Sequence, residues 1–297
     1  MPDVQANGIT IAYEDTGPAD APPVLLIMGL AAQLTLWPQD FVDRIAAGGF
    51  RVIRHDNRDV GLSTHFREAG VPDLAAMMAE IRAGRMPAVP YTLEDMAADA
   101  VGLLDALQVP KAHIVGGSLG GMIAQLVAAH HPDRVASLVP LFTTSGNRSL
   151  PPGDPDAMAA LRTLPEDMSS VDSIVSHSVW LRRKIGTPGF PYDEAKLRAF
   201  LRMQVERDYD PTGPARQFAA AVVAQPRDPL LEKLAVPTLV VHGDRDPLFP
   251  IEHARHLAQV IPGAQLKVMD GMGHDLPPGH VPEMADAMVA HFRAAQG

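Results

Sequence analysis

A serine between glycines is the part of the sequence whose spacing most directly indicates chemistry. Ser118 stands in the run GGSLG at positions 116–120, which matches the pattern G-x-S-x-G. An apolar segment ends just before this run and a helical pattern begins just after it. On such a strand-to-helix turn the serine is held in a strained conformation with its hydroxyl projecting, and small residues on both sides keep other backbone away. The motif predicts a nucleophilic serine.

Two other interpretations of this turn involve no nucleophile: an ordinary glycine-rich turn and a phosphate-binding loop. A phosphate-binding loop requires a lysine directly after its second glycine, whereas here Gly121 is followed by Met122. Random placement of glycines and serines predicts roughly 0.07 matches to G-x-S-x-G in a chain of this composition. The motif and its flanking segments therefore favour the nucleophile.

A serine hydroxyl reacts efficiently only when a histidine takes its proton and a carboxylate orients that histidine. When the serine lies on such a turn, the acid and then the histidine follow it in the chain. His274 lies on a glycine-rich loop after the last apolar segment, and Asp246 follows the apolar segment 238–242. Asp246 is preferred to Asp244, which could close the turn itself. Most of the other histidines lie within predicted strands or helices, where structural roles are expected.

Acyl transfer also needs donors for the negative oxygen of the tetrahedral intermediate. The backbone amide of Leu119 follows the nucleophile, and a second amide is expected from the loop 28–32. In that loop Gly29 permits close approach and Leu30 would supply the amide. The alternative is that this loop is an ordinary tight turn.

The elements that must position these groups are short apolar segments alternating with amphipathic ones. Strands are predicted at 9–13, 24–28, 51–55, 113–115, 135–141, 238–242 and 265–269, and helices at 93–107, 121–129, 251–260 and 281–293. Strands without polar alternation are typical of a sheet covered on both faces. The alternation predicts an α/β fold with a mostly parallel, doubly wound sheet that binds ligands at the carboxyl ends of its strands.

One segment breaks the alternation. Residues 147–230 are helical in pattern, poor in strands and bracketed by prolines, which predicts a helical cap inserted into a core made of 1–146 and 231–297. The cap segment has as many basic as acidic residues, so the excess negative charge lies on the core. We predict that Trp180, Phe200 and Tyr209 line an apolar substrate pocket; alternatively they form the insert's own small core. A second candidate flap spans 65–90.

Composition excludes several classes of protein. Thirty-five acidic against 25 basic residues give a net charge of −10, which argues against binding to nucleic acid. The sequence has no cysteine, so thiol nucleophiles and cysteine-held metals are ruled out. No apolar run reaches the roughly 20 residues of a membrane span, and the first residues lack the pattern of a secretory signal. We expect a cytoplasmic protein that needs no metal or cofactor and acts on a small molecule; its oligomeric state is left open.

These motifs together resemble those of the α/β-hydrolase superfamily, and within it the aclacinomycin methylesterase-like carboxylesterases. The likeness rests on LIMGL at 26–30, RHDNRDVGLST at 54–64, the serine motif, HGDRD at 242–246 and GMGH at 271–274. It implies the α/β-hydrolase fold, with Ser118 as nucleophile, His274 as base and Asp246 as acid, and with the Leu30 and Leu119 amides as oxyanion hole. Met28 stands where the superfamily commonly has histidine; the donor is a backbone amide, so activity is not threatened.

The predicted function is hydrolysis of carboxylic esters of small to medium hydrophobic substrates through an acyl-enzyme on Ser118, without a cofactor. The same three residues would also serve a lactonase, a carbon–carbon hydrolase or a perhydrolase. An aspartate-nucleophile hydrolase is disfavoured because the turn carries serine. A noncatalytic ligand-binding receptor is a further alternative.

Overall fold

A single eight-stranded sheet organises the chain. The computed structural model describes residues 1–296, and its strands follow the order β1-β2-β4-β3-β5-β6-β7-β8. They are β1 (Asp3–Ala6), β2 (Ile9–Thr16), β3 (Pro23–Ile27), β4 (Arg51–His55), β5 (Ala112–Gly117), β6 (Val135–Leu141), β7 (Leu239–Gly243) and β8 (Gln265–Met269). β1 and β2 pair antiparallel with each other, and β2 pairs antiparallel with β4, whereas the remaining pairs are parallel. The predicted mostly parallel sheet is confirmed.

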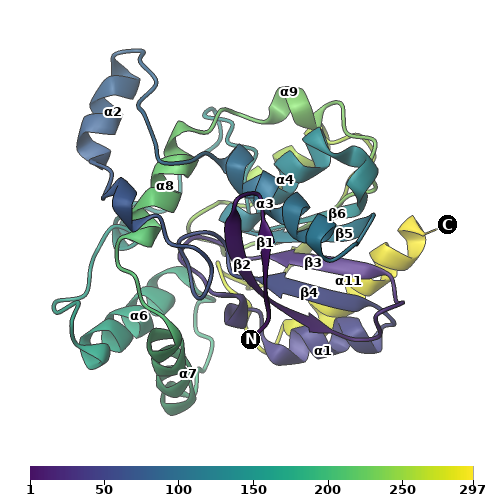
Figure 1. The fold of residues 1–297 in the computed structure, drawn as a ribbon, viewed down its shortest axis with the longest axis horizontal. Helices are drawn as coiled ribbons and strands as arrows, with labels where there is room; N and C mark the ends of the chain where they lie inside the picture. Colours follow the sequence, from purple (N-terminus) through teal and green to yellow (C-terminus); the bar gives the residue numbers. More distant parts are fainter. Residues whose placement is uncertain (297) are drawn as a thin grey trace.

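Helices cover both faces of the sheet (Figure 1). Along β3, Leu25 and Ile27 belong to the apolar cluster under α3 (Leu93–Ala106), α4 (Leu119–His130) and α10 (Glu252–Val260). Val24 and Leu26 belong to the opposite cluster, under α1 (Gln39–Ala47) and α11 (Val281–Ala295). Successive side chains of a strand point to opposite faces, so a continuous apolar run fills both layers.

Two elements of the core differ from the sequence-based expectation. The strand pair at the amino terminus has an additional member, β1, joined to β2 by Asn7 and Gly8, both at positive φ. Asn-Gly between two strands is typical of a tight hairpin, and this signal could have predicted β1. The amphipathic helix α1 was also missed; Phe41, Val42 and Ile45 form its buried face. Outside this core, the flap segment contains α2 (Leu74–Arg82).

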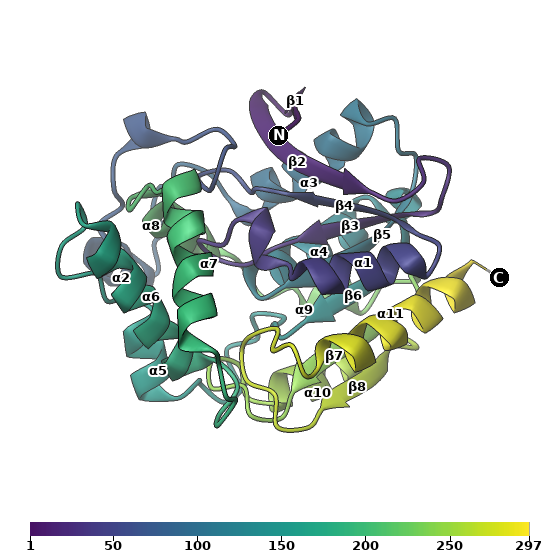
Figure 2. The ribbon, with the colours of Figure 1, turned by 90° about the horizontal axis from the view of Figure 1, so that it is seen from below.

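Residues 147–230, all described in the structure, contain helices and no strand. The helices are α5 (Pro155–Ala160), α6 (Val171–Ile185), α7 (Glu194–Arg207), α8 (Gly213–Val223) and α9 (Asp228–Leu231). α5 to α8 lie together at one side of the molecule, beyond one end of the strands, in both ribbon views (Figure 2). α9 lies apart from them, over α4. Just before α9, the buried Arg227 donates a hydrogen bond to Gln125 of α4 at 2.9 Å.

Three short 3-10 helices complete the described elements: Leu34–Leu36, Arg67–Ala69 and Pro132–Arg134. Among residues 1–296, no helix has both the length and the apolar character that crossing a membrane requires.

Candidate active site

The turn between β5 and α4 holds Ser118 in a strained conformation. Its φ is 55° and its ψ is −119°, in a region that residues with a side chain rarely adopt. The two glycines of the motif are required by close packing. A Cβ on Gly116 would lie 2.1 Å from the carbonyl oxygen of Gly120, and a Cβ on Gly120 would lie 2.1 Å from that of Ile27. The spacing of the motif therefore follows from the contacts of this turn.

The structure brings the three predicted side chains into one hydrogen-bonded chain. His274 Nε2 lies 2.9 Å from Ser118 Oγ, and His274 Nδ1 lies 2.8 Å from Asp246 Oδ2. Because a carboxylate only accepts, Nδ1 carries the proton that it donates to Asp246, and Nε2 is left to accept from the serine hydroxyl. The imidazole is thus oriented as a base toward Ser118.

The environment of Asp246 keeps its carboxylate ionised. Burial alone would raise the pKa of this carboxyl, but the charges of His274 and His242 and their hydrogen bonds outweigh it and hold the pKa well below its usual range. Its second oxygen accepts the backbone N–H groups of Leu248 and Phe249, at 2.8 and 3.0 Å. A charge held this way fixes the orientation of the histidine ring.

The neighbouring acid has a different position. Asp244 accepts the backbone N–H of Gly271 at 2.7 Å and so joins the turn after β7 to the turn after β8. Asp244 was expected to close its own turn and instead bonds a neighbouring one, whereas Asp246 lies beside the histidine.

The predicted oxyanion loop lies against the nucleophile. A Cβ on Gly29 would lie 3.0 Å from the Cβ of Ser118 and 3.5 Å from its Oγ, so the loop backbone directly adjoins the hydroxyl. Leu119 is the first residue of α4, where backbone N–H groups have no partner within the helix. Leu30 follows Gly29 and Leu119 follows Ser118, so the assignment of their amides to the oxyanion hole stays a prediction that fits this contact.

The alpha/beta hydrolase fold family model matches residues 22–280. This chain belongs to the α/β-hydrolase fold family. The fold class expected from the sequence is confirmed, and so is the resemblance to methylesterases of this family.

Two relatives of this hydrolase have names that describe action on an ester and on a lactone. It is 33% identical to "Rhodomycin D methylesterase DauP" of Streptomyces sp. (strain C5), over 98% of both chains. It is 24% identical to "3-oxoadipate enol-lactonase 2" of Acinetobacter baylyi, over 89% of this chain and 86% of that protein. Among solved structures, a thermophilic esterase from Thermogutta terrifontis superposes with a TM-score of 0.72 at 25% identity, covering all of both chains. The hydrolase is an ester hydrolase.

Two aromatic rings that the sequence reasoning missed enclose the histidine of this hydrolase. Phe142 and Phe249 contact the His274 ring edge-on, with centroids 5.0 and 5.6 Å away. Phe142 follows β6 and Phe249 follows the Asp246 turn, so each lies just beyond a strand end. That position was the available signal, because side chains there converge on the site of such a sheet.

A glutamine from α8 also contacts the site and was missed. Gln217 is fully buried, and its Oε1 accepts the backbone N–H of Ala31 at 2.8 Å. Its Nε2 donates to the carbonyl oxygen of Arg58, also at 2.8 Å. Ala31 has a φ of 59°, so this bond holds a strained residue next to the predicted oxyanion amide.

The three aromatic residues predicted to line the substrate pocket lie in different surroundings. Phe200 packs against the small cluster of Val175, Val179 and Leu201, which favours the alternative of a core within the insert. Trp180 is 40% exposed, and its ring lies tilted against that of His177, with centroids 5.5 Å apart. Tyr209 is partly buried in the segment between α7 and α8. A role for them in substrate binding stays a prediction, which chain-length preference in alanine variants would test.

One cluster has the residue types of a metal site. Ligand atoms of Asp59, His65 and Asp210 lie within 4.8 Å of one another. However, Arg216 binds Asp59 through two nitrogens, at 2.7 and 2.8 Å, and Arg67 lies 2.9 Å from Asp210. With both carboxylates already neutralised, the cluster joins the insert to the core as an ion-pair network, and its chemistry fits a structural role better than a metal centre.

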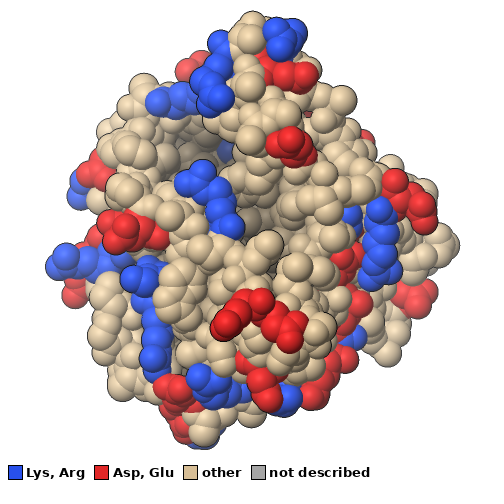
Figure 3. Space-filling model, turned by 90° about the vertical axis from the view of Figure 1, so that its left-hand side faces the viewer, with Lys and Arg blue, Asp and Glu red and all other residues tan. Residues whose placement is uncertain are grey.

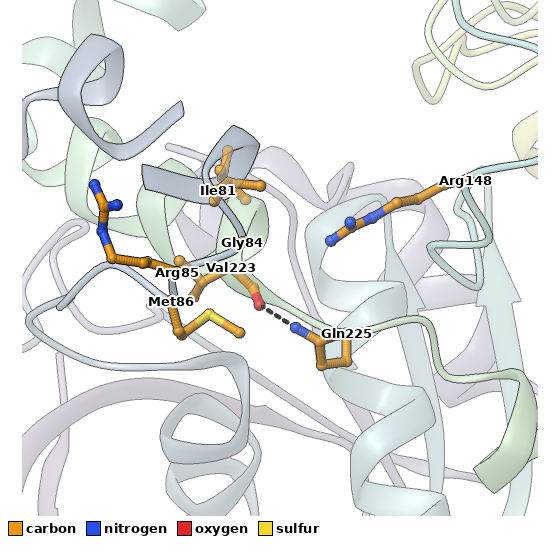
Figure 4. A pocket seen from close by; sticks show the side chains of 8 residues that line it. Ile81, Gly84, Arg85, Met86, Arg148, Val223 and Gln225 are labelled. Carbon is orange, nitrogen blue, oxygen red and sulfur yellow. Dashed lines mark hydrogen bonds between the residues drawn. The ribbon is translucent and has the colours of Figure 1, made fainter. Parts of the chain in front are cut away.

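The surface over α2 and the insert is hollowed and carries interspersed charges (Figure 3). A cavity of about 210 Å³ lies between the end of α2 and the end of α8 (Figure 4). It is lined by Ile81, Gly84, Arg85, Met86, Arg148, Val222, Val223 and Gln225. Ser118 and His274 are not among these residues.

Proposed function

We propose that this hydrolase cleaves carboxylic esters through a covalent acyl-enzyme on Ser118. The observation that carries the proposal is the unbroken hydrogen-bonded chain from Ser118 through His274 to Asp246. In this mechanism His274 Nε2 removes the hydroxyl proton while Ser118 Oγ attacks the ester carbonyl, forming a tetrahedral intermediate. His274 then donates that proton to the leaving alcohol as the ester bond breaks.

Hydrolysis of the acyl-enzyme repeats these steps with water. His274 takes a proton from a water molecule, the hydroxide attacks the acyl carbonyl, and the proton returns to Ser118 Oγ as the carboxylic acid leaves. Asp246 stays ionised throughout and stabilises the imidazolium, which agrees with its depressed pKa. The amides of Leu30 and Leu119 stabilise the negative oxygen.

Methyl esters of hydrophobic carboxylic acids are the first substrates to examine. The support for a methyl ester is the 33% identity to a protein named as a methylesterase. The support for a hydrophobic acid is the pair of rings, Phe142 and Phe249, that enclose the base. We further propose that residues 147–230 cap this site, because Gln217 of that segment bonds the loop beside Ser118.

A lactone is the second candidate substrate, favoured by the enol-lactonase relative. A lactone is a cyclic ester, so the same attack opens the ring and the alcohol stays attached to the acyl group. A panel of methyl esters, p-nitrophenyl esters and lactones, measured side by side, ranks the two candidates by kcat/KM.

Ser118→Ala tests the proposed nucleophile. We expect turnover of p-nitrophenyl butyrate to fall by about 10⁴-fold or more while circular dichroism and the unfolding temperature stay close to those of the original protein. Ser149→Ala, a change at an exposed serine in the loop before α5, is the control and should keep full activity. Substantial activity in a pure Ser118→Ala preparation would overturn the proposal.

A further inference from the structure

The loop that carries the catalytic histidine is hydrogen-bonded to the insert by its own backbone. His274 N–H donates to the carbonyl oxygen of Ile185, the last residue of α6, at 2.9 Å. Gly273 N–H donates to Thr187 Oγ1 at 3.0 Å. Two consecutive amides of the histidine loop are thus satisfied by the insert, one by the end of α6 and one by the α6–α7 linker, residues 186–193.

The residue after the histidine holds the same linker from the other side. Asp275 is buried, and its Oδ1 accepts both the backbone N–H and the hydroxyl of Thr187, at 3.1 and 2.7 Å. Its Oδ2 accepts the hydroxyl of Tyr192. Burial and the neighbouring Asp275 raise the pKa of Tyr192, so this hydroxyl stays protonated and able to donate. The hydroxyl of Thr187 therefore accepts a hydrogen bond from Gly273 and donates one to Asp275.

The two backbones are in direct contact, which limits how the linker can sit. A Cβ on Gly273 would lie 2.4 Å from the carbonyl carbon and oxygen of Gly186. A Cβ on Gly186 would in turn lie 2.8 Å from Asp275 Oδ2. Only glycine permits this approach, so the linker and the histidine loop dock as one closely packed unit.

We propose that Thr187 and Asp275 are positioning residues that align His274 with Ser118 only while the α6–α7 linker is docked. The inference rests on the proposed function, because it assigns these residues a role in placing its base. The imidazole ring of His274 is held by Asp246, whereas the backbone of His274 is held by the insert. A displacement of about 1 Å at a reacting group can cost about 10²-fold in rate, so release of the linker lowers catalysis without removing a reacting group.

This arrangement makes the position of the insert part of the catalytic geometry. Loss of the linker contact would break the bonds from Gly273 and those to Asp275, and it would leave the bond of His274 to Ile185 at the end of α6 without this support. The base is therefore in its working position in the arrangement in which the linker contacts the histidine loop.

A matched pair of substitutions at Thr187 tests the proposal. Thr187→Val keeps the shape of the side chain and removes both hydroxyl bonds, whereas Thr187→Ser keeps both. We expect Thr187→Val to lower kcat for p-nitrophenyl butyrate by about 10- to 100-fold with little change in KM. Thr187→Ser should restore kcat to within about threefold of the original. The rate constant for labelling by a fluorophosphonate should fall in parallel with kcat, because labelling depends on the same base.

Thr212→Val is the matched control. Thr212 also lies in the insert, donates its hydroxyl to Asp210 and accepts from Arg216, at 2.6 and 3.0 Å, so the substitution removes a comparable pair of bonds away from the histidine loop. Its kcat and labelling rate should match those of the original protein. A Thr187→Val enzyme with unchanged kcat, or a Thr212→Val enzyme with an equal loss, would overturn the proposal.

Two further measurements distinguish a failure of this inference from misfolding of the variant and from a failure of the proposed function. If Thr187→Val does not fold, Tyr192→Phe removes one bond to Asp275 and should lower the labelling rate about threefold to tenfold; an unchanged rate overturns the inference. If fluorophosphonate fails to label the original protein, the proposed function is wrong and the inference falls with it. Labelling that is normal and equal in Thr187→Val overturns the inference alone.

Discussion

We predict that replacing Asp246 by asparagine moves the imidazole proton of His274 from Nδ1 to Nε2. One oxygen of Asp246 accepts the N–H groups of Leu248 and Phe249, and the other accepts from His274 Nδ1. An asparagine that keeps the two backbone bonds must point its amide NH₂ at Nδ1. Nδ1 can then only accept, so the imidazole proton moves to Nε2, where the ring can no longer take the proton of Ser118.

The size of the loss follows from that change of tautomer. The same exchange in a serine protease lowers kcat about 10⁴-fold, which corresponds to about 5 kcal/mol of transition-state stabilisation. Asp246 here has the same bond to the histidine, and its side chain is fully buried, so solvent cannot replace the lost charge. We expect Asp246→Asn to lose about 10⁴-fold in kcat at pH 7, with KM little changed.

The assay is steady-state hydrolysis of p-nitrophenyl butyrate by the original protein, Asp246→Asn and Asp244→Asn. Asp244 accepts a single backbone N–H, from Gly271, so its exchange should change kcat by no more than about threefold. Circular dichroism checks that each variant is folded. The reasoning is refuted if Asp246→Asn keeps kcat within tenfold, or if Asp244→Asn loses as much as Asp246→Asn does.

Two further predictions concern stability and the oxyanion loop. Burial lowers the pKa of His55 to about 4, whereas in the unfolded chain its pKa is about 6.5. Above pH 6.5 the imidazole is neutral in both states. As pH falls from 6.5 toward 4, only the unfolded chain takes up the proton, so the unfolding free energy decreases. In urea unfolding, His55 should account for about 2 kcal/mol of the loss in unfolding free energy between pH 6.5 and pH 5, and a His55→Gln variant with the same pH dependence would contradict this. Gln217→Ala should lower kcat about tenfold, because the Ala31 amide and the adjacent Leu30 lose their fixed position. Gln217→Glu keeps an acceptor for Ala31 but places an oxygen against the carbonyl of Arg58 and a negative charge beside the oxyanion loop, so it should lose at least as much. Equal kcat in all three proteins would exclude this role.

Sequence reasoning could predict the turn at Ser118 because the residues that its packing constrains fall within one short run. The glycines at 116 and 120 are dictated by backbone contacts within and beside the turn, so their spacing is visible in the chain. The order of acid and histidine after the serine follows from strand order in such a sheet, and this led to Asp246 and His274. The structure places both in the expected chain of hydrogen bonds.

The contacts between insert and core could not be predicted in the same way. Gln217 and Ala31 are 186 residues apart, and Thr187 and Asp275 are 88 apart. Glutamine and threonine occur on many surfaces, and nothing in their neighbours indicates the partner that tertiary packing gives them. Phe200 illustrates the converse: an aromatic residue in a helical insert suits a ligand pocket and a small core equally, and only the packing against Leu201 and its neighbours separates them.

The most direct test of the central claim is the mass of the hydrolase after reaction with a fluorophosphonate, followed by peptide mapping. The account predicts one adduct per chain, located on the peptide that contains Ser118 and absent from Ser118→Ala. An adduct on another residue, or an unlabelled protein that still hydrolyses esters, would contradict it.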